Sequence, residues 1–305
     1  MIKTEFTKKE ADQFLETMRQ EDALVRLVDP IARRVEAEAR ETGCLREEAV
    51  CNLLWGRCER CENCTSLRAL QIRGQSYKME MLNGRTYWVY SRFLQVNGQP
   101  LVAEIVKDIT ENLYMDSNQR DQLGMLICNY NQMLISDSLT GVYNRRFLDE
   151  HFLPSLKCCH EEQIAVNLAF IDIDHFKEIN DQYGHNAGDA LLKDASGFWK
   201  LHFNSREKGR ERLVIRFGGD EILIVACGIP IEQFEAEIQH DYGQMRKVCY
   251  YTNDIQFPFQ LAIGVASSKE LGADWSWNQL LELADQRMYG EKTKRKNSAG
   301  TERKG

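Results

Sequence analysis

Two Asn-Gly dipeptides constrain the fold of the first half of this chain more than any other feature. Each separates two runs rich in β-forming residues: Asn83-Gly84 lies between 77–82 and 85–93, and Asn97-Gly98 lies between 91–96 and 101–108. Asn-Gly between such runs favours the type I′ turn, because both central residues of that turn need a positive φ. The sequence therefore predicts three consecutive antiparallel strands, a meander, ending near Thr110.

Helical segments are expected before this meander. Thr7-x-x-Glu10 has the capping-box pattern, in which two side chains satisfy backbone groups at the start of a helix. After the break at Asp29-Pro30, the run from Ile31 to about Thr42 is also expected to be helical. Residues 44–70 are expected to be irregular. The first part of the chain is thus expected to be a small α+β domain.

Length and composition suggest a globular protein of about two domains. The chain has 305 residues, of which 43% are hydrophobic and 28% charged, with 5 prolines. The net charge of −7 argues against a basic surface for nucleic acid. No apolar run approaches the roughly 18 residues that a membrane helix needs, and the N-terminus shows no secretory signal. We therefore expect a cytoplasmic protein that does not insert into a membrane.

Half of the ten cysteines fall within one short stretch. The pattern is Cys51-x6-Cys58-x2-Cys61-x2-Cys64, with Cys44 nearby. These thiolates could bind zinc or an iron–sulfur cluster, or two of them could form a redox pair whose pKa values Arg57, Arg60 and Arg68 lower. Free, partly buried thiols are the third alternative. The other five are expected to be buried small apolar groups: Cys128, Cys158, Cys159, Cys227 and Cys249.

A heptad-like pattern follows the meander. Apolar residues recur at steps of four and three residues, at six of the eight positions 109, 113, 116, 120, 123, 127, 130 and 134. The spacing suits a short parallel coiled coil that joins two protomers. A single amphipathic helix lying on its own domain fits equally well, and the sequence leaves both interpretations open.

The second half of the chain alternates strand-like and helical runs. The strand candidates are 164–172, 213–217, 222–227 and 259–266, and the run from Trp277 to about Lys292 is helical. Strands alternating with helices predict an α/β sandwich. The polar, basic tail from Lys292 is expected to be frayed.

Four carboxylates of this second domain are expected to meet at one edge of its sheet. They are Asp172 and Asp174, at the end of a buried strand, and Asp220 and Glu221, at the tip of a hairpin. Clustered carboxylates repel unless a cation joins them, and hard oxygen ligands favour Mg²⁺ shared with phosphates. Gly218-Gly219 lets the backbone approach a polyanion, and Lys177 could neutralise phosphate charge. The set indicates metal-assisted phosphoryl or nucleotidyl transfer.

Gly-Gly-Asp-Glu alone is also compatible with an ordinary acidic turn, but it occurs here with three further motifs in order. The set comprises Asp137–Arg146, Asp172–Asp181 with Gly184-His185 and Gly188-Asp189, Arg216–Ile222, and Ala284-Asp285 with Met288-Tyr289 and Lys292. Residues 137–297 thereby resemble the GGDEF family of diguanylate cyclases. The resemblance implies a fold related to adenylyl cyclase catalytic domains and polymerase palms, which are ferredoxin-like. It also implies the conversion of two GTP molecules to cyclic di-GMP and two pyrophosphates at the interface of a homodimer.

The resemblance also implies roles for individual residues. Asp172, the Ile173 carbonyl and Asp220 would hold Mg²⁺ or Mn²⁺, and Asp220 would accept the proton of the attacking hydroxyl, with Glu221 close by. Lys177 would spread the charge of the transition state. The implied substrate-binding residues are Asn180, His185, Asp189, Gly218, Gly219, Lys292 and Lys296. Lys296 departs from the family, which commonly has Arg there, and Ile222 replaces a Phe with little expected effect.

An absent motif predicts a difference in regulation. Many family members carry an inhibitory Arg-x-x-Asp that ends five residues before the signature, where this chain has Gly209-Arg210-Glu211-Arg212. The resemblance therefore implies weak or missing product inhibition.

The meander that ends in Asp108-Ile109-Thr110 resembles a PAS sensory domain, whose last strand often ends this way before a signalling helix. The expected organisation is an N-terminal helix (1–20), a PAS-like sensor with the cysteine cluster (21–110), a helical linker (111–136), a GGDEF catalytic domain (137–298) and a tail (299–305). The alternative function is a catalytically silent, GTP-binding regulator that acts through protein–protein contacts. The intact Asp172, Lys177 and Asp220 argue against it.

Overall fold

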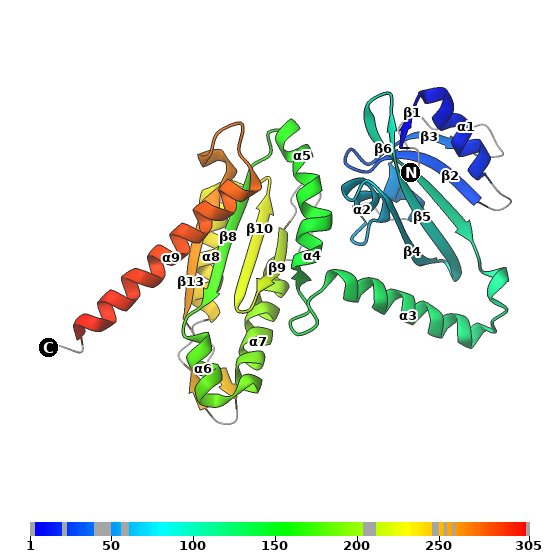
Figure 1. Cartoon of the computed structure of the whole chain (residues 1–305). Coiled ribbons are helices and arrows are strands. Elements are labelled where there is room, and N and C mark those ends of the chain that lie inside the picture. Colours follow the sequence, from blue (N-terminus) through cyan, green and yellow to red (C-terminus); the bar gives the residue numbers. More distant parts are fainter. Residues whose placement is uncertain are drawn as a thin grey trace. The chain divides into compact units, whose positions relative to one another are not determined.

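The computed structural model in Figure 1 describes residues 4–19, 23–39, 50–55, 61–203, 212–245, 250–252, 255–257 and 260–302. The chain divides into two compact units. The N-terminal unit comprises Met1–Ile135 and Asp149–Cys158, and the C-terminal unit comprises Ser136–Leu148 and Cys159–Gly305. Among the described residues, no helix combines the length and apolar character needed to cross a bilayer. The predicted α/β (α+β) fold class is confirmed.

The N-terminal unit is built on one sheet with the strand order β1-β5-β6-β2-β3, in which β4 also pairs with β5. Its strands are β1 (Glu5–Phe6), β2 (Ala23–Asp29), β3 (Arg34–Ala39), β4 (Gln75–Leu82), β5 (Arg85–Val96) and β6 (Gln99–Asp108). Strands β4, β5 and β6 form the predicted meander. All four residues of the two Asn-Gly turns have positive φ, as the type I′ turn requires.

Helix α1 (Lys8–Met18) begins as the capping box predicts, because Thr7 Oγ1 accepts from Glu10 N at 3.3 Å and Glu10 Oε2 accepts from Thr7 N at 2.9 Å. The helix predicted from Ile31 to Thr42 is wrong over β3 (Arg34–Ala39), which pairs with β2. The Asp29 carboxylate accepts from Ile31 N, which turns the chain back on itself. Pairing with β2 therefore overrides a weak helical preference.

Different layers cover the two faces of this sheet. Helix α1 packs Ala11 and Leu15 against one face in an apolar cluster. The other face carries α2 (Thr65–Gln71) and the 3₁₀ turn η1 (Cys51–Trp55), and its interior combines small apolar clusters with buried polar groups. There the buried Arg26 Nε donates to Glu104 at 2.6 Å. The interior under α2 thus consists of paired charges and hydroxyls rather than hydrocarbon alone.

The linking helix α3 (Ser117–Ile135) begins later than the heptad pattern suggests. The turn η2 (Glu111–Leu113) and the left-handed Tyr114 precede it, so positions 109, 113 and 116 lie outside the helix. One side of α3, with the buried Ile127 and Ile135, packs against β4 of its own unit. The opposite side exposes a row of large apolar residues: Met125, Leu126, Tyr130 and Met133. The inner face of α3 therefore agrees with the interpretation of an amphipathic helix that lies on its own domain.

The C-terminal unit has a sheet with the order β13-β8-β10-β9-β7. Its strands are β7 (Tyr143–Asn144), β8 (Val166–Ile173), β9 (Arg212–Gly218), β10 (Glu221–Cys227) and β13 (Leu261–Ser267), with a separate pair β11 (Tyr250–Thr252) and β12 (Ile255–Phe257). Its main helices are α6 (Phe176–Tyr183), α7 (His185–Phe203), α8 (Ile231–Met245) and α9 (Trp277–Glu302). Between β7 and β8 the chain forms α4 (Arg145–Phe147), η3 (Leu148–Phe152) and α5 (Leu153–Glu161), of which residues 149–158 belong to the N-terminal unit, and η4 (Ser268–Glu270) follows β13. The predicted strands are confirmed, but α9 continues past Lys292, where a frayed tail was expected.

Helices cover both faces of this second sheet. Helices α7 and α8 contribute Trp199, Phe234 and Ile238 to a large apolar core against one face. Helix α9 lies along β13 and β8 (Figure 1). Its approach to β13 depends on Gly264, since a Cβ built there would lie 2.0 Å from the Ala284 carbonyl oxygen and 2.3 Å from Met288 N. Gly264 therefore sets how close α9 lies to the edge of the sheet where β8 ends.

Candidate functional site

The predicted carboxylates gather where β8 and β10 meet. Asp172 on β8 and Glu221 on β10 are direct register partners in the antiparallel ladder. Asp220 precedes Glu221 in the tight turn, which Gly219 allows with a φ of +46°. Asp172 and Asp174 are buried on β8 and just after it. The register of β8 and β10 therefore places these strand ends side by side, as the sequence predicts.

These carboxylates perturb one another. Burial raises the pKa of Asp220, and the neighbouring Asp172 raises it further. Burial also raises the pKa of Glu221, followed by the charges of Asp220, Asp172 and Asp285. Lys292 opposes both shifts. A group of like charges in a partly buried place favours either protonation or the arrival of a cation.

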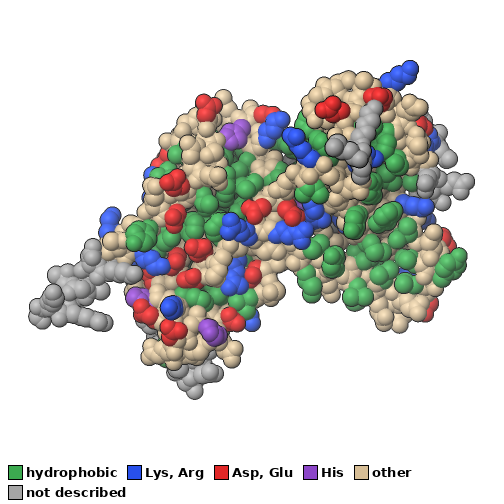
Figure 2. Space-filling view, viewed as in Figure 1, with side chains coloured by type: hydrophobic (Ala, Val, Ile, Leu, Met, Phe, Trp, Pro, Cys, Tyr) green, Lys and Arg blue, Asp and Glu red, His purple; other side chains and the backbone are tan. Residues whose placement is uncertain are grey.

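Helix α9 supplies two cations to this acidic cluster. Lys292 Nζ lies 2.6 Å from Asp172 Oδ1, and Arg295 Nη1 lies 3.1 Å from Asp174 Oδ2. Burial alone would lower the pKa of Lys292, but its hydrogen bond to Asp172 and the nearby Asp220 raise it. Acidic and basic side chains also lie side by side on the face of this unit seen in Figure 2. The predicted Lys292 is therefore in the cluster, and Lys296 lies within α9, its side chain outside the described part.

The donor set fits magnesium better than it fits an all-protein metal centre. Among the described residues, no three His, Cys, Asp or Glu side chains converge as a metal-binding group. Mg²⁺ commonly binds through one or two carboxylates and takes its other ligands from water and substrate phosphates. Asp172 and Asp220 supply that kind of partial site, since Asp172 lies close enough to Asp220 to raise the pKa of Asp220.

The turn that carries Asp220 is held by a second contact. Arg216 donates from Nε and Nη2 to the Gly219 carbonyl oxygen at 3.0 and 2.8 Å. Its Nη1 donates to Asp137 Oδ1 at 3.0 Å, and the same oxygen accepts from Thr140 N at 2.9 Å. Asp137 lies two residues after the last residue of α3. The opening motif is thus tied through Arg216 to the signature turn.

Asp137→Asn should lower the free energy of unfolding by about 2 kcal/mol at neutral pH, since hydrogen bonds to a charged group are lost. Burial would raise the pKa of Asp137, but hydrogen bonds from Thr140 and Arg216 lower it below the usual value. A carboxyl whose pKa is lowered by folding stabilises the folded state at pH values above its unfolded pKa. This stabilisation is lost as the pH falls through the folded-state pKa. Urea unfolding should therefore show the gap between wild type and variant closing in acid.

The control for this variant is Asp121→Asn, which removes an exposed carboxylate from α3. It should leave the unfolding curve unchanged at every pH. An Asp137→Asn gap that is as wide in acid as at neutral pH would contradict the electrostatic explanation.

The predicted nucleotide-binding residues lie on the helical hairpin α6–α7. Lys177 and Asn180 come from α6, and His185 and Asp189 come from the first turns of α7. Gly188 lets Asn180 lie against α7, since a Cβ there would be 2.2 Å from Asn180 Oδ1. Within the part of the chain that the structure describes, Lys177, His185 and Asp189 make no ion pair or hydrogen bond to the acidic cluster. The structure thus brings Asp172, Asp220, Glu221 and Lys292 together. The four predicted nucleotide-binding residues lie apart from this cluster, on α6 and α7.

The cysteine segment is only partly described. Cys58 and Cys44 lie outside the described residues, while Cys51, Cys61 and Cys64 lie within them without a disulfide. The pKa of Cys51 is raised to about 12 by burial and then by Cys64 and Glu104, although Arg26 opposes the shift. The expectation of arginine-lowered thiol pKa values is therefore wrong for Cys51. The prediction of buried outlying cysteines holds for Cys227 and is wrong for the exposed Cys128; Cys158 and Cys159 are half-buried, and Cys249 lies outside the described residues.

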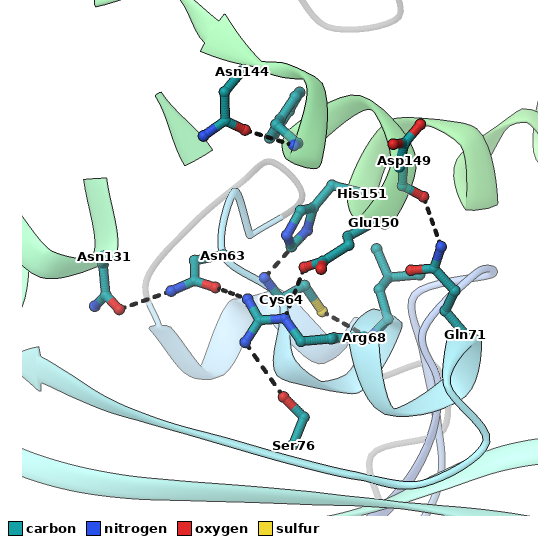
Figure 3. Close-up of polar contacts among 12 residues, drawn as sticks. Asn63, Cys64, Arg68, Gln71, Ser76, Asn131, Asn144, Asp149, Glu150 and His151 are labelled. Atoms are coloured by element: carbon teal, nitrogen blue, oxygen red, sulfur yellow. Dashed lines mark hydrogen bonds and ion pairs between the residues drawn. The ribbon is translucent and has the colours of Figure 1, made fainter. Parts of the chain in front are cut away.

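Arg68, named in that expectation, is engaged elsewhere. Figure 3 shows it on α2, where Nε donates to Glu150 at 3.0 Å and Nη2 donates to Asn63 Oδ1. Asn63, which lies between Cys61 and Cys64 in the chain, donates from Nδ2 to Asn131 Oδ1 on α3 at 2.7 Å (Figure 3). The cysteine segment is thus hydrogen-bonded directly to the linking helix within the N-terminal unit.

Sequence reasoning missed two basic residues of the C-terminal unit. Arg295 was missed because it lies among several basic residues in a segment expected to be a frayed tail. It lies one residue before the position where the family commonly has Arg. Arg216 was visible in the signature motif, but its partner Asp137 is 79 residues away in sequence. The inhibitory-motif positions 209–211 lie outside the described residues, so weak product inhibition stays a prediction.

Comparison with known proteins identifies the second half of the chain. Residues 134–298 match the family described as "GGDEF: Diguanylate cyclase, GGDEF domain". The diguanylate cyclase DosC of Escherichia coli (strain K12) is 30% identical over 166 residues, which cover 53% of this chain and 34% of that protein. The cyclic di-GMP phosphodiesterase NbdA of Pseudomonas aeruginosa is 38% identical over 106 residues, which cover 35% of this chain and 13% of that protein. The chain therefore spans about a third or less of the length of these curated relatives.

A solved structure supports the fold. The coiled coil and GGDEF domain of DgcB from Caulobacter crescentus, solved in complex with c-di-GMP, has a TM-score of 0.51 and 19% identity, and covers 58% of this chain and 90% of that chain. At this identity the likeness concerns the fold alone. The family match, however, covers more than half of the 305 residues, and on that ground this chain belongs to the GGDEF diguanylate cyclase family.

Proposed function

We propose that this protein is a Mg²⁺-dependent diguanylate cyclase that condenses two GTP molecules into cyclic di-GMP and two pyrophosphates. The observation that carries the proposal is the cluster of Asp172, Asp220, Glu221 and Lys292 at the end of β8, in a chain of this family. It unites acidic ligands for a divalent cation with a base and a phosphate-binding cation. The reaction needs GTP, so we place the protein in the cytoplasm, where the nucleotide is available.

The proposed chemistry follows from the charges of the cluster. Asp172, the Ile173 carbonyl and Asp220 would hold Mg²⁺ or Mn²⁺, which supplies Lewis-acid activation of the α-phosphate. Asp220 accepts the proton of the attacking 3′-hydroxyl as general base. The O3′–Pα bond forms as the bond from Pα to the bridging oxygen breaks, and pyrophosphate leaves.

The remaining roles concern the substrate. Lys292 and Lys177 offset the negative charge of the phosphates, and Lys292 must then exchange Asp172 for phosphate oxygens. Asp189 and Asn180 would read guanine, because a carboxylate accepts from its adjacent N1–H and N2 amine. ATP lacks that donor pair and should be rejected through an unpaired buried group.

The test is turnover of the full chain with GTP and Mg²⁺, with the product identified by mass. Cyclic di-GMP is the expected product, and ATP should give none. GTP binding without any product would instead favour the silent regulator that acts through protein contacts. Adding cyclic di-GMP to an active sample then tests the predicted weak product inhibition.

A cyclase that joins two GTP molecules symmetrically needs two protomers, and we propose that α3 contributes to the dimer contact. Its outer row exposes Leu126 (66%), Tyr130 (64%) and Met133 (74%), at steps of four and three residues. That spacing places the three side chains on one seam, as in a coiled coil. The inner row is occupied by β4, so only the outer row is available to a partner.

Leu126→Glu should raise the dimer dissociation constant at least about tenfold, because it places a charge in the proposed apolar seam. Cyclase activity should fall at low protein concentration and recover as the concentration rises. Sedimentation velocity and turnover measure the two effects. Leu201→Glu is the matched control, since Leu201 is 85% exposed on α7 and its replacement should change neither. An unchanged dimer in Leu126→Glu would remove α3 from the interface.

We further propose that the N-terminal unit, with its PAS-like meander, is a sensor that controls the cyclase through α3. Support comes from the hydrogen bond between Asn63, in the cysteine segment, and Asn131 on α3. A pocket of about 220 Å³ adjoins this bond, with Glu62, Met81, Gly124 and Ile127 in its walls. A ligand, metal or oxidation event at the cysteines would act on α3 over the distance of one hydrogen bond.

The sensor proposal is tested by Asn63→Ala in the full chain. Turnover should change at least about twofold, the lower end of typical coupling effects. Gln71→Ala, which removes a bond to the Asp149 carbonyl on the same unit, is the control. Equal turnover in wild type and Asn63→Ala would overturn this route. Metal content of the same samples separates zinc or iron–sulfur ligation from unligated thiols.

A further inference from the structure

We propose that Arg295 is a positioning residue of the nucleotide site, which neutralises Asp174 and fixes the register of α9 so that Lys292 faces Asp172. The inference rests on the proposed function and adds to it a residue to which the resemblance gives no role. Arg295 does not touch the proposed reacting atoms; it acts through Asp174 and through the helix that carries Lys292.

Asp174 is a carboxylate that needs a partner. Its side chain is 7% exposed, and its backbone N donates to the Gln260 carbonyl oxygen at 2.9 Å, which holds it beside the start of β13. Arg295 Nη1 lies 3.1 Å from its Oδ2. Leaving a buried carboxylate without its partner is costly, because desolvation is then uncompensated.

Asp174 also lies within electrostatic range of the site. It follows Asp172 by two residues in the chain, and Lys292 Nζ lies 2.6 Å from Asp172 Oδ1. Without Arg295, its full negative charge would act on Lys292 and on any triphosphate bound nearby. Arg295 therefore removes from the site a charge that opposes nucleotide binding.

The same guanidinium fastens α9 to the sheet. Arg295 Nη1 donates to the Leu261 carbonyl oxygen at 2.7 Å, and Nη2 lies 3.2 Å from Glu291 Oε2. Glu291 in turn accepts from Ile263 N at 3.4 Å. Two backbone groups of β13 thus hold the turn of α9 that contains Lys292, which lies on the same side of the helix as Arg295, three residues earlier.

A lysine cannot reproduce these contacts. The planar fork of Arg295 reaches a carboxylate, a backbone carbonyl and a second carboxylate at once, whereas an ammonium is a single point charge on a flexible stem. Arg295→Lys should therefore keep part of the charge effect and lose the fixed register.

A matched control is Arg287, which lies eight residues earlier in the same helix. Arg287 Nη1 donates to the Val265 carbonyl oxygen at 2.6 Å, and Nη2 lies 2.6 Å from Glu270 Oε2. Arg287 thus also joins α9 to β13 and to a carboxylate, but its partners are not the acids of the site. Arg287→Met and Arg295→Met should lower the melting temperature by similar amounts.

The experiment compares these variants by KM for GTP and by the dissociation constant of N-methylanthraniloyl-GTP without turnover. Arg295→Met should raise both the KM for GTP and the dissociation constant of the probe about tenfold, as expected for one lost charged hydrogen bond. The change in kcat should be smaller than either. Adding Asp174→Asn to Arg295→Met should restore part of the binding, because the unpaired charge is gone while the contacts that hold α9 are still missing. Arg287→Met should bind the probe like wild type.

Three results would overturn the role: probe binding by Arg295→Met equal to wild type, equal losses in Arg287→Met, or no recovery with Asp174→Asn added. A wild type that binds the probe but makes no cyclic di-GMP would refute the proposed function, while the probe-binding comparison would still decide the role of Arg295.

Discussion

Gly264→Ala is expected to cost about 3 kcal/mol or more of the free energy of unfolding. The added Cβ would lie 2.0 Å from the Ala284 carbonyl oxygen and 2.3 Å from Met288 N, both backbone atoms of α9. A helix backbone cannot turn aside as a side chain can. Either α9 lifts away from β13 or the unit fails to fold, and urea or thermal unfolding measures the loss.

The matched control is Gly197→Ala in α7, where a Cβ would meet nothing within 4 Å. That change should be neutral or should stabilise by about 0.5–1 kcal/mol, since glycine in a helix interior is disfavoured. If Gly264→Ala does fold, its α9 should sit farther from β8, so its affinity for GTP should also fall. Equal unfolding curves for Gly264→Ala and wild type would show that α9 does not pack as described.

Asp220→Asn should lower turnover by at least about a thousandfold, because it removes both a proposed magnesium ligand and the proton acceptor. The same variant should be at least as stable as the wild type at neutral pH. The pKa of Asp220 is raised by burial and by Asp172, so its ionised form opposes folding. That penalty is absent below the unfolded pKa and is fully present above the folded pKa.

The measurements for this variant are product formation by mass and unfolding between acid and neutral pH. Asp194→Asn is the control: burial raises the pKa of this α7 carboxyl without an acidic neighbour, and its loss should leave turnover intact. Full activity in Asp220→Asn would end its assignment as base. A variant less stable than wild type at neutral pH would mean that Asp220 is better paired than its surroundings indicate.

Local signals in the sequence predicted local structure well. The Asn-Gly turns fixed both hairpins because only a positive φ closes them, and Thr7 with Glu10 marked the start of α1. The prediction failed at β3, whose letters suit a helix as well as a strand and whose pairing with β2 decides the outcome. It also placed the start of α3 too early, because periodicity alone cannot reveal the left-handed Tyr114 that interrupts the chain.

The candidate site was predictable to the extent that it lies in contiguous motifs. Asp172, Asp220 and Glu221 could be grouped from the sequence because they lie at strand ends that meet at one edge. The pair Arg295–Asp174 spans 121 residues, and nothing in either segment points to the other. Such pairs depend on how closely α9 approaches the sheet, which is a property of the packing at Gly264.

The pocket beside Asn63 lies against α3 and β4 of the N-terminal unit and has a volume of about 220 Å³. A pocket of this size can hold a small solute or several water molecules. Gly124 already brings α3 against Met81, with only 2.7 Å between a Cβ built there and the Met81 sulfur. A small solute could occupy the pocket with α3 in place, whereas a bulkier one that entered between α3 and β4 would have to displace the helix.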